Sequence, residues 1–167
     1  MRKLVSVTVL LLAISCLLCG CFPNAMLIPS ESSVGQSKRF EINGFSILLT
    51  EEFKEEQSQA GFDAYFVADF CGVVVKKEAF TLQKDFAEKT LEEYTASVMK
   101  NNGYTNQAPQ TKDGLWFYDR VTEGRYACSY CYKGSDAFWI VQFICNLSDK
   151  ETLADIIYLW AQSVEVR

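Results

Sequence analysis

Residues 40–48 read Phe-Glu-Ile-Asn-Gly-Phe-Ser-Ile-Leu, two apolar arms joined by Asn43-Gly44. A two-residue hairpin turn needs positive φ at both positions, which Asn and Gly tolerate better than other residues do. The stretch therefore predicts a β-hairpin with a tight turn. We expect the folded domain to begin just before this hairpin, at Arg39.

Further β-strand patterns follow along the chain, each an apolar, β-branched or aromatic run that ends at turn residues. They predict a second hairpin and then a meander of three strands. The expected strands and the turns within the meander are 65–68, 73–77, 115–121, 125–132 and 138–146, with Glu123-Gly124 and Gly134-Ser135-Asp136 between the last three.

A helical pattern replaces the strand pattern between residues 80 and 103, where apolar residues recur at spacings of three and four. Thr90 and Glu93 have the capping-box form, in which each side chain bonds the backbone N–H of the other residue. Asn102-Gly103 supplies the left-handed exit that ends a helix. An amphipathic helix is therefore predicted after Thr90.

A second helix is predicted near the end of the chain, where Ser148 and Glu151 repeat the capping-box form. Its apolar stripe consists of Leu153, Ile156, Ile157, Trp160 and Ala161. Each helix must bury such a stripe against another element, and the predicted sheet offers two faces. The fold class predicted is α+β, an antiparallel sheet meander with helices packed on its faces.

Three stretches carry a resemblance to a known family. They are residues 40–47, residues 90–94, which read Thr-Leu-Glu-Glu-Tyr, and residues 160–164, which read Trp-Ala-Gln-Ser-Val. In this order they resemble the PsbP-like superfamily, which includes bacterial lipoproteins related to DcrB, over about residues 39–167. The resemblance implies an α/β/α sandwich that binds or scaffolds other proteins without catalysis. It transfers no functional residue to this chain.

The N-terminus resembles a bacterial lipoprotein signal, with a cationic start, an uncharged apolar run and a cysteine at its exit. Leu18-Cys19-Gly20-Cys21 resembles the lipobox, although Cys19 stands where Ser or Ala is usual. Cys21 is the expected site of diacylation and the expected new N-terminus, and Cys16 is a weaker acceptor. The alternative is an uncleaved transmembrane anchor, because roughly 18 apolar residues suffice to span a bilayer.

The domain organisation follows from this assignment. Residues 1–20 are expected to be the signal peptide, 21–38 the lipidated cysteine and a flexible linker, and 39–167 one PsbP-like domain. Two acyl chains hold a protein stably at a membrane, where one chain does not. We therefore expect attachment to the extracytoplasmic face of the cell membrane.

Charge and composition exclude several classes of function. The chain has 16 basic and 21 acidic residues, and removal of residues 1–20 leaves 14 basic against 21 acidic, so nucleic acid is not an expected partner. The chain has no histidine, which excludes Ser-His-Asp and Cys-His catalysis and His-ligated metal sites. The acidic cluster of Glu51, Glu52, Glu55 and Glu56 is expected to be solvated, and a calcium site is the less favoured alternative. No catalytic residue, cofactor or metal is expected.

Four cysteines remain beyond the signal: Cys71, Cys128, Cys131 and Cys145. Cys128 and Cys131 have the C-x-x-C spacing of redox and metal sites, but in a strand an offset of three places them on opposite faces. The predicted meander puts Cys128 opposite Phe143, with Cys145 as a diagonal neighbour. Cys128–Cys145 is therefore the candidate disulfide, and the alternative is that the thiols are small buried hydrophobes.

Three tyrosines, Tyr126, Tyr130 and Tyr132, share a strand face with Cys128. Tyr is frequent at protein interfaces because it offers contact area with a polar tip. If the last helix leaves this face uncovered, it is the candidate partner surface. Otherwise the tyrosines pack within the sheet core.

These inferences predict a membrane-anchored envelope lipoprotein that acts as a non-catalytic binding or accessory module for an unidentified envelope partner. One alternative is a thiol-active envelope protein that uses Cys128 and Cys131. Another is an inert surface spacer without a specific ligand.

Overall fold

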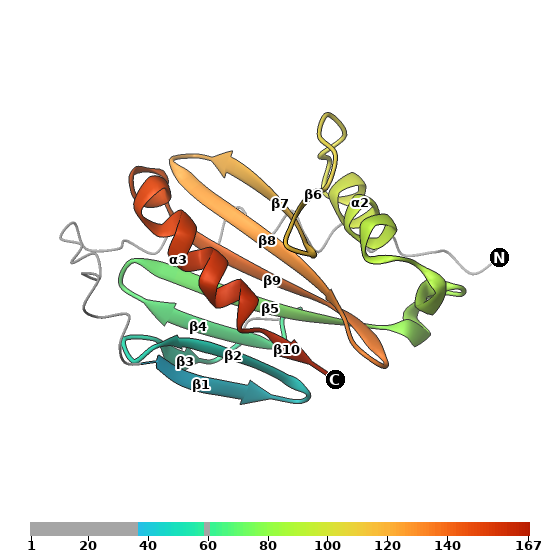
Figure 1. The fold of residues 1–167 in the computed structure, drawn as a ribbon, viewed down its shortest axis with the longest axis horizontal. Helices are drawn as coiled ribbons and strands as arrows, with labels where there is room; N and C mark the ends of the chain where they lie inside the picture. Colours follow the sequence, from blue (N-terminus) through green and yellow to red (C-terminus); the bar gives the residue numbers. More distant parts are fainter. Residues whose placement is uncertain (1–36, 59–60) are drawn as a thin grey trace.

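Two antiparallel sheets and two α-helices make up the computed structural model, which describes residues 37–58 and 61–167 (Figure 1). The expected lipidation site Cys21 and its signal lie outside the described residues. The first strand begins at Ser37, two residues before the predicted start of the domain. None of the helices in the described ranges is long and apolar enough to cross a membrane.

The larger sheet has seven strands in the order β3-β4-β5-β9-β8-β7-β6, and the smaller has three in the order β1-β2-β10. This arrangement confirms the predicted α+β fold class. The strands are β1 (Ser37–Ile42), β2 (Phe45–Thr50), β3 (Lys54–Glu56), β4 (Ala64–Ala68), β5 (Cys71–Ala79), β6 (Gln110–Lys112), β7 (Leu115–Thr122), β8 (Arg125–Lys133), β9 (Ala137–Asn146) and β10 (Glu165–Val166). The helices are α2 (Leu91–Asn101) and α3 (Lys150–Gln162), with the 3-10 turns η3 (Phe80–Leu82), η4 (Phe86–Glu88) and η5 (Leu147–Asp149).

The predicted hairpin turn at Asn43-Gly44 is confirmed. Asn43 has φ of 46° and Gly44 has φ of 92°, so both turn residues are left-handed, as a two-residue hairpin requires. Asp113-Gly114 and Glu123-Gly124 repeat this conformation at the turns on either side of β7. The three turns fix the register of the strands they join.

The two faces of the large sheet have different covers. Helix α3 and the small sheet lie side by side over one face, and α2 with η3 and η4 lies over the other (Figure 1). Alternate residues of β8 illustrate the division, because Tyr130 packs in the cluster with α3 and Cys131 in the cluster with α2.

The two helices begin differently. The predicted capping box at α2 is confirmed: the backbone N–H of Thr90 donates to Glu93 Oε2 at 2.8 Å, and Glu93 N–H donates to Thr90 Oγ1 at 3.2 Å. The predicted capping box at α3 is wrong. Ser148 lies inside the turn η5, so its hydroxyl donates to Asp149 Oδ1 at 3.0 Å instead of capping the helix.

Candidate functional site

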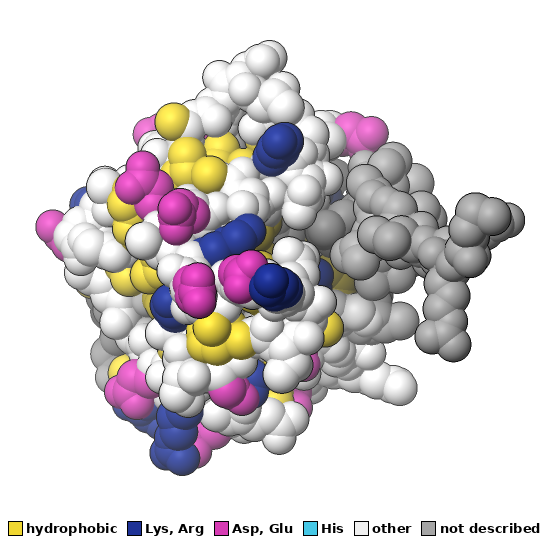
Figure 2. Space-filling view, turned by 90° about the vertical axis from the view of Figure 1, so that its right-hand side faces the viewer, with side chains coloured by type: hydrophobic (Ala, Val, Ile, Leu, Met, Phe, Trp, Pro, Cys, Tyr) yellow, Lys and Arg dark blue, Asp and Glu magenta, His cyan; other side chains and the backbone are white. Residues whose placement is uncertain are grey.

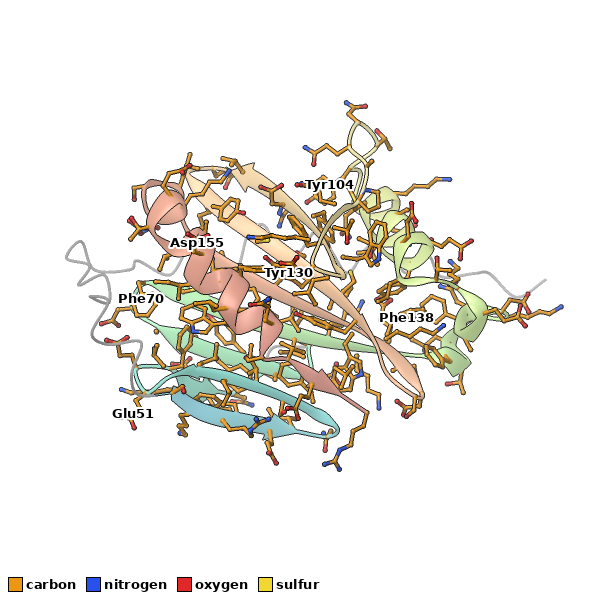
Figure 3. The ribbon with its side chains drawn as sticks, in the orientation of Figure 1. Glu51, Phe70, Tyr104, Tyr130, Phe138 and Asp155 are labelled. Carbon is orange, nitrogen blue, oxygen red and sulfur yellow. The ribbon has the colours of Figure 1, made fainter. Side chains whose placement is uncertain are left out.

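A pocket of about 240 Å³ lies between α2 and the face of the large sheet that α2 covers only in part. Its sheet side is built from strand residues that alternate onto this face. They come from β5, β7 and β9 and include Lys76, Glu78, Tyr118, Arg120, Ile140 and Gln142. Figure 3 shows Tyr104, another lining residue, at the end of α2 nearest β6.

A row of polar side chains crosses three strands at the floor of the pocket, and its two ends, Tyr118 and Gln142, line the pocket. Tyr118 of β7 is opposite Ser129 of β8, and Ser129 is opposite Gln142 of β9. Gln142 Nε2 donates to Ser129 Oγ at 2.9 Å, and Ser129 also forms a side-chain hydrogen bond with Tyr118. Burial raises the pKa of Tyr118, so its hydroxyl stays protonated. The row is satisfied internally and gives the floor fixed polar groups.

One edge of the pocket holds a neutralised ion pair. Lys76 Nζ lies 2.6 Å from Glu78 Oε1, and both side chains are about one-fifth exposed, at 20% and 19%. The Tyr94 hydroxyl of α2 donates to Glu78 Oε2 at 2.9 Å, which ties the helix to the sheet. Burial, followed by the Glu78 charge, raises the pKa of Tyr94. These groups hold the pocket wall rather than offer a free acid or base.

The opposite edge holds a cation without a carboxylate partner. Arg120 Nη1 donates to the Tyr104 hydroxyl, and the guanidinium carbon lies 5.7 Å from the centre of the Tyr104 ring. The rings of Tyr104 and Tyr118 are 5.9 Å apart. Within residues 37–58 and 61–167, no carboxylate lies within 4.0 Å of the Arg120 side chain. Neutral aromatic groups therefore position this charge.

Sequence reasoning missed this pocket. Its signal was a set of polar residues inside otherwise apolar strands, with Ser129 in the middle of β8 and Gln142 in the middle of β9. Neither residue alone indicates a pocket. Only the register of β7, β8 and β9 places them in one row.

The two cysteines of the C-x-x-C motif lie on opposite faces of β8, as the strand assignment predicted. Cys128 belongs to the cluster under α3 and Cys131 to the cluster under α2. Burial raises the pKa of Cys128 to about 11, although hydrogen bonds from Tyr130 and Tyr126 lower it in part. Burial also raises the pKa of Cys131 to about 12. Both side chains are thiols at neutral pH and they cannot act as a pair.

The register around the candidate disulfide is the predicted one. Cys128 is opposite Phe143, so Cys145 is its diagonal neighbour. Gly72 is opposite Ile144, and one step further along the same register Cys71 faces Cys145 directly. Cys71, Cys128 and Cys145 are buried free thiols in this structure. A Cys128–Cys145 bond stays a prediction, and Cys71 is a directly opposed competitor for Cys145.

The tyrosine face is not an open surface. Tyr126, Tyr130 and Tyr132 are all buried, and the Tyr132 hydroxyl donates to the backbone oxygen of Ala161 in α3 at 2.8 Å. Figure 3 shows Tyr130 on the large sheet, beside α3. The condition for a partner surface at these residues is not met, because α3 must bury its apolar stripe and this face receives it.

Burial of the thiols gives a prediction for their reactivity. In the native full chain, Cys71, Cys128, Cys131 and Cys145 should react with N-ethylmaleimide far more slowly than in denaturant. For Cys128 the raised pKa alone lowers the thiolate fraction roughly hundredfold. Peptide mapping by mass spectrometry measures the rate at each cysteine. Fast native labelling of both Cys128 and Cys131 would support the thiol-active alternative.

Comparison with known proteins identifies the fold. No protein-family profile matches the chain, and no curated protein sequence is significantly similar to it. The solution structure of cyanobacterial PsbP (CyanoP) from Synechocystis sp. PCC 6803 matches 84% of this chain and 98% of that chain, with a TM-score of 0.55. The fold is PsbP-like. The sequence identity of 12% means that this similarity extends to the fold alone.

Two further structures are less similar. A protein from Bacteroides thetaiotaomicron matches 79% of this chain and 49% of its own, at 14% identity and a TM-score of 0.46. A Pseudomonas aeruginosa protein of unknown function matches 80% of this chain and 99% of its own, at 12% identity and a TM-score of 0.42. Neither adds to the fold assignment.

Proposed function

We propose that this protein is a lipid-anchored, extracytoplasmic binding module without catalytic activity, and that the pocket beneath α2 is where it binds. The observation that carries the proposal is the pocket itself, a cavity on a PsbP-like fold with fixed polar groups on its floor and an unneutralised Arg120 at its edge. Concave sites with a few well-placed polar groups in a partly apolar lining are typical of small-molecule binding.

The chemistry of the described residues favours binding over catalysis. The chain has no histidine. Lys76 and Glu78 neutralise each other, and burial raises the pKa of every described thiol, as in Cys131 and Cys145, where it is about 12. None of these groups is poised to transfer a proton or attack a substrate at neutral pH. The other alternative, an inert spacer, predicts that the pocket binds no ligand.

The anchor is the second part of the proposal and rests on the sequence at the N-terminus. Leu18-Cys19-Gly20-Cys21 follows an uncharged apolar run and resembles a lipobox. Lipid on Cys21 would hold the domain at the membrane without any basic patch, which suits a chain with a formal net charge of −5.

Substitution of the anchor residue tests this part. Cys21→Ala should abolish incorporation of a fatty-acid analogue in metabolic labelling, because Cys21 supplies the thiol that is acylated. The protein should then appear as an unprocessed precursor or in the soluble fraction, since the acyl chains supply most of the membrane affinity. Cys16→Ala is the matched control and should keep the label. Label retained by Cys21→Ala would refute this assignment.

A further inference from the structure

We infer that the pocket beneath α2 binds a small amphipathic organic anion, one acidic group such as a carboxylate, sulfonate or phosphate carried on an apolar or aromatic body. This inference rests on the proposed function, because it names the class of ligand for the same pocket. It follows from the charge of the lining, from the setting of Arg120 and from the apolar side chains that also line the pocket.

The charge of the pocket is opposite in sign to that of the protein. Among the described residues that line it, Lys76, Lys89 and Arg120 are basic and Glu78 is acidic. The whole chain has a net charge of −5. A concave site concentrates the field of the charges that line it, so an anion is attracted here despite the negative net charge of the chain. Figure 2 views the molecule from the side of α2 and shows basic, acidic and apolar side chains interspersed on this face.

Arg120 is arranged to receive an acidic group. A guanidinium has five N–H donors in a planar fork that matches the two oxygens of an acid. Tyr104 accepts from Nη1 and its ring contacts the guanidinium, which holds the fork in place without neutralising its charge. A fully exposed guanidinium gains little free energy from pairing with an anion. Arg120 is half-enclosed and already held in position, so it loses less conformational entropy when an anion binds.

The residues of β8 opposite this part of β7 are small. Ala127 is opposite Arg120, and Ser129 is opposite Tyr118. Small side chains at these two positions leave the long side chains of β7 and β9 that line the pocket without a bulky neighbour between them.

Part of the remaining lining can contact an apolar body, next to polar residues of α2 such as Ser97 and Asn101. Apolar side chains from both the sheet and α2 form this part, and Ile140 and Val98 are among them. The volume of about 240 Å³ is below the usual range of drug-sized sites, about 300–1,000 Å³. A single or fused ring bearing one acidic group is the size of ligand that this space admits.

Isothermal titration calorimetry of the full chain in a non-ionic detergent tests the inference with two probes. Naphthalene-2-sulfonate carries the anion, and naphthalene-2-sulfonamide is a nearly isosteric neutral molecule. We expect the sulfonate to bind more tightly. Arg120→Gln should weaken sulfonate binding roughly tenfold or more, the scale of a hydrogen bond to a charged group, and leave sulfonamide binding within about twofold.

A matched control separates the pocket from overall charge. Arg39→Gln removes the same charge from β1, in the small sheet on the other side of the molecule, and should leave both affinities unchanged. Arg120→Lys keeps the charge but not the fork, so it should bind the sulfonate with intermediate affinity. Detergent binding of the probes is common to all variants and cancels in the comparison.

Three results would overturn the inference in distinguishable ways. Equal weakening by Arg120→Gln and Arg39→Gln would mean that overall charge, not the pocket, attracts the anion. Sulfonamide binding as tight as sulfonate binding would leave a binding pocket without anion preference. Binding of neither probe would remove the proposed function of the pocket as well.

Discussion

Replacement of Trp160 by Ala is expected to lower the free energy of unfolding by about 3–5 kcal/mol, the usual cost of a buried aromatic-to-Ala change. Trp160 in α3 is 7% exposed. Its ring centre lies 5.2 Å from that of Phe53, 6.1 Å from that of Phe143 and 6.4 Å from that of Phe70. The side chain therefore joins α3 to the chain after β2, to β9 and to the turn between β4 and β5.

Denaturant unfolding followed by circular dichroism measures this effect. Leu159→Ala is the matched control, because Leu159 is the preceding residue of the same helix and is 53% exposed. Leu159→Ala should change the free energy of unfolding by no more than about 0.5 kcal/mol, as other surface substitutions do. An unchanged midpoint for Trp160→Ala would show that α3 does not dock through this residue.

Phe138→Ala is the second large effect, and it acts on the opposite face of the sheet. Phe138 in β9 is fully buried, and its ring stacks on Tyr94 of α2 with centres 4.0 Å apart and planes 6° apart. Phe80 and Phe86 pack edge-on against it at 5.2 Å and 5.3 Å. Figure 3 shows Phe138 near the start of α2. We expect Phe138→Ala to lower the free energy of unfolding by about 3–5 kcal/mol. We also expect α2 to be held less firmly over the pocket.

The same unfolding assay applies, with Leu82→Ala as the control because Leu82 lies in η3 and is exposed. The effects of Phe138→Ala and Trp160→Ala should add, since the two residues belong to separate clusters on opposite faces of the sheet. A loss below about 1 kcal/mol for Phe138→Ala would mean that the ring stack contributes little to the docking of α2.

The elements predicted correctly from sequence depend on local rules. The turn at Asn43-Gly44 follows from the φ angles that these residues tolerate, and the start of α2 from the spacing of Thr90 and Glu93. The pairing of Cys128 with Phe143 follows from the length of one loop. In each case the residues that decide the structure lie within about twenty positions of one another.

The features that sequence reasoning missed depend on distant contacts. The pairing of β10 with β2 brings Glu165 opposite Ser46 and adds a third strand to the small sheet. No local sequence pattern predicts this pairing. Alternation correctly placed Tyr130 and Cys131 on opposite faces, but it could not say which face α3 would cover. The pocket was missed for the same reason, since only the ladder of β7, β8 and β9 brings Arg120 and Gln142 to one pocket.

The edges of the large sheet affect whether two molecules of this protein can pair through their strands. Each edge is a strand of three exposed residues, Lys-Glu-Glu in β3 and Gln-Thr-Lys in β6. An unpaired edge normally invites a strand from another molecule, and short, charged edges discourage that pairing. Both edges of the large sheet are short and polar, so pairing between the edges of neighbouring copies is disfavoured.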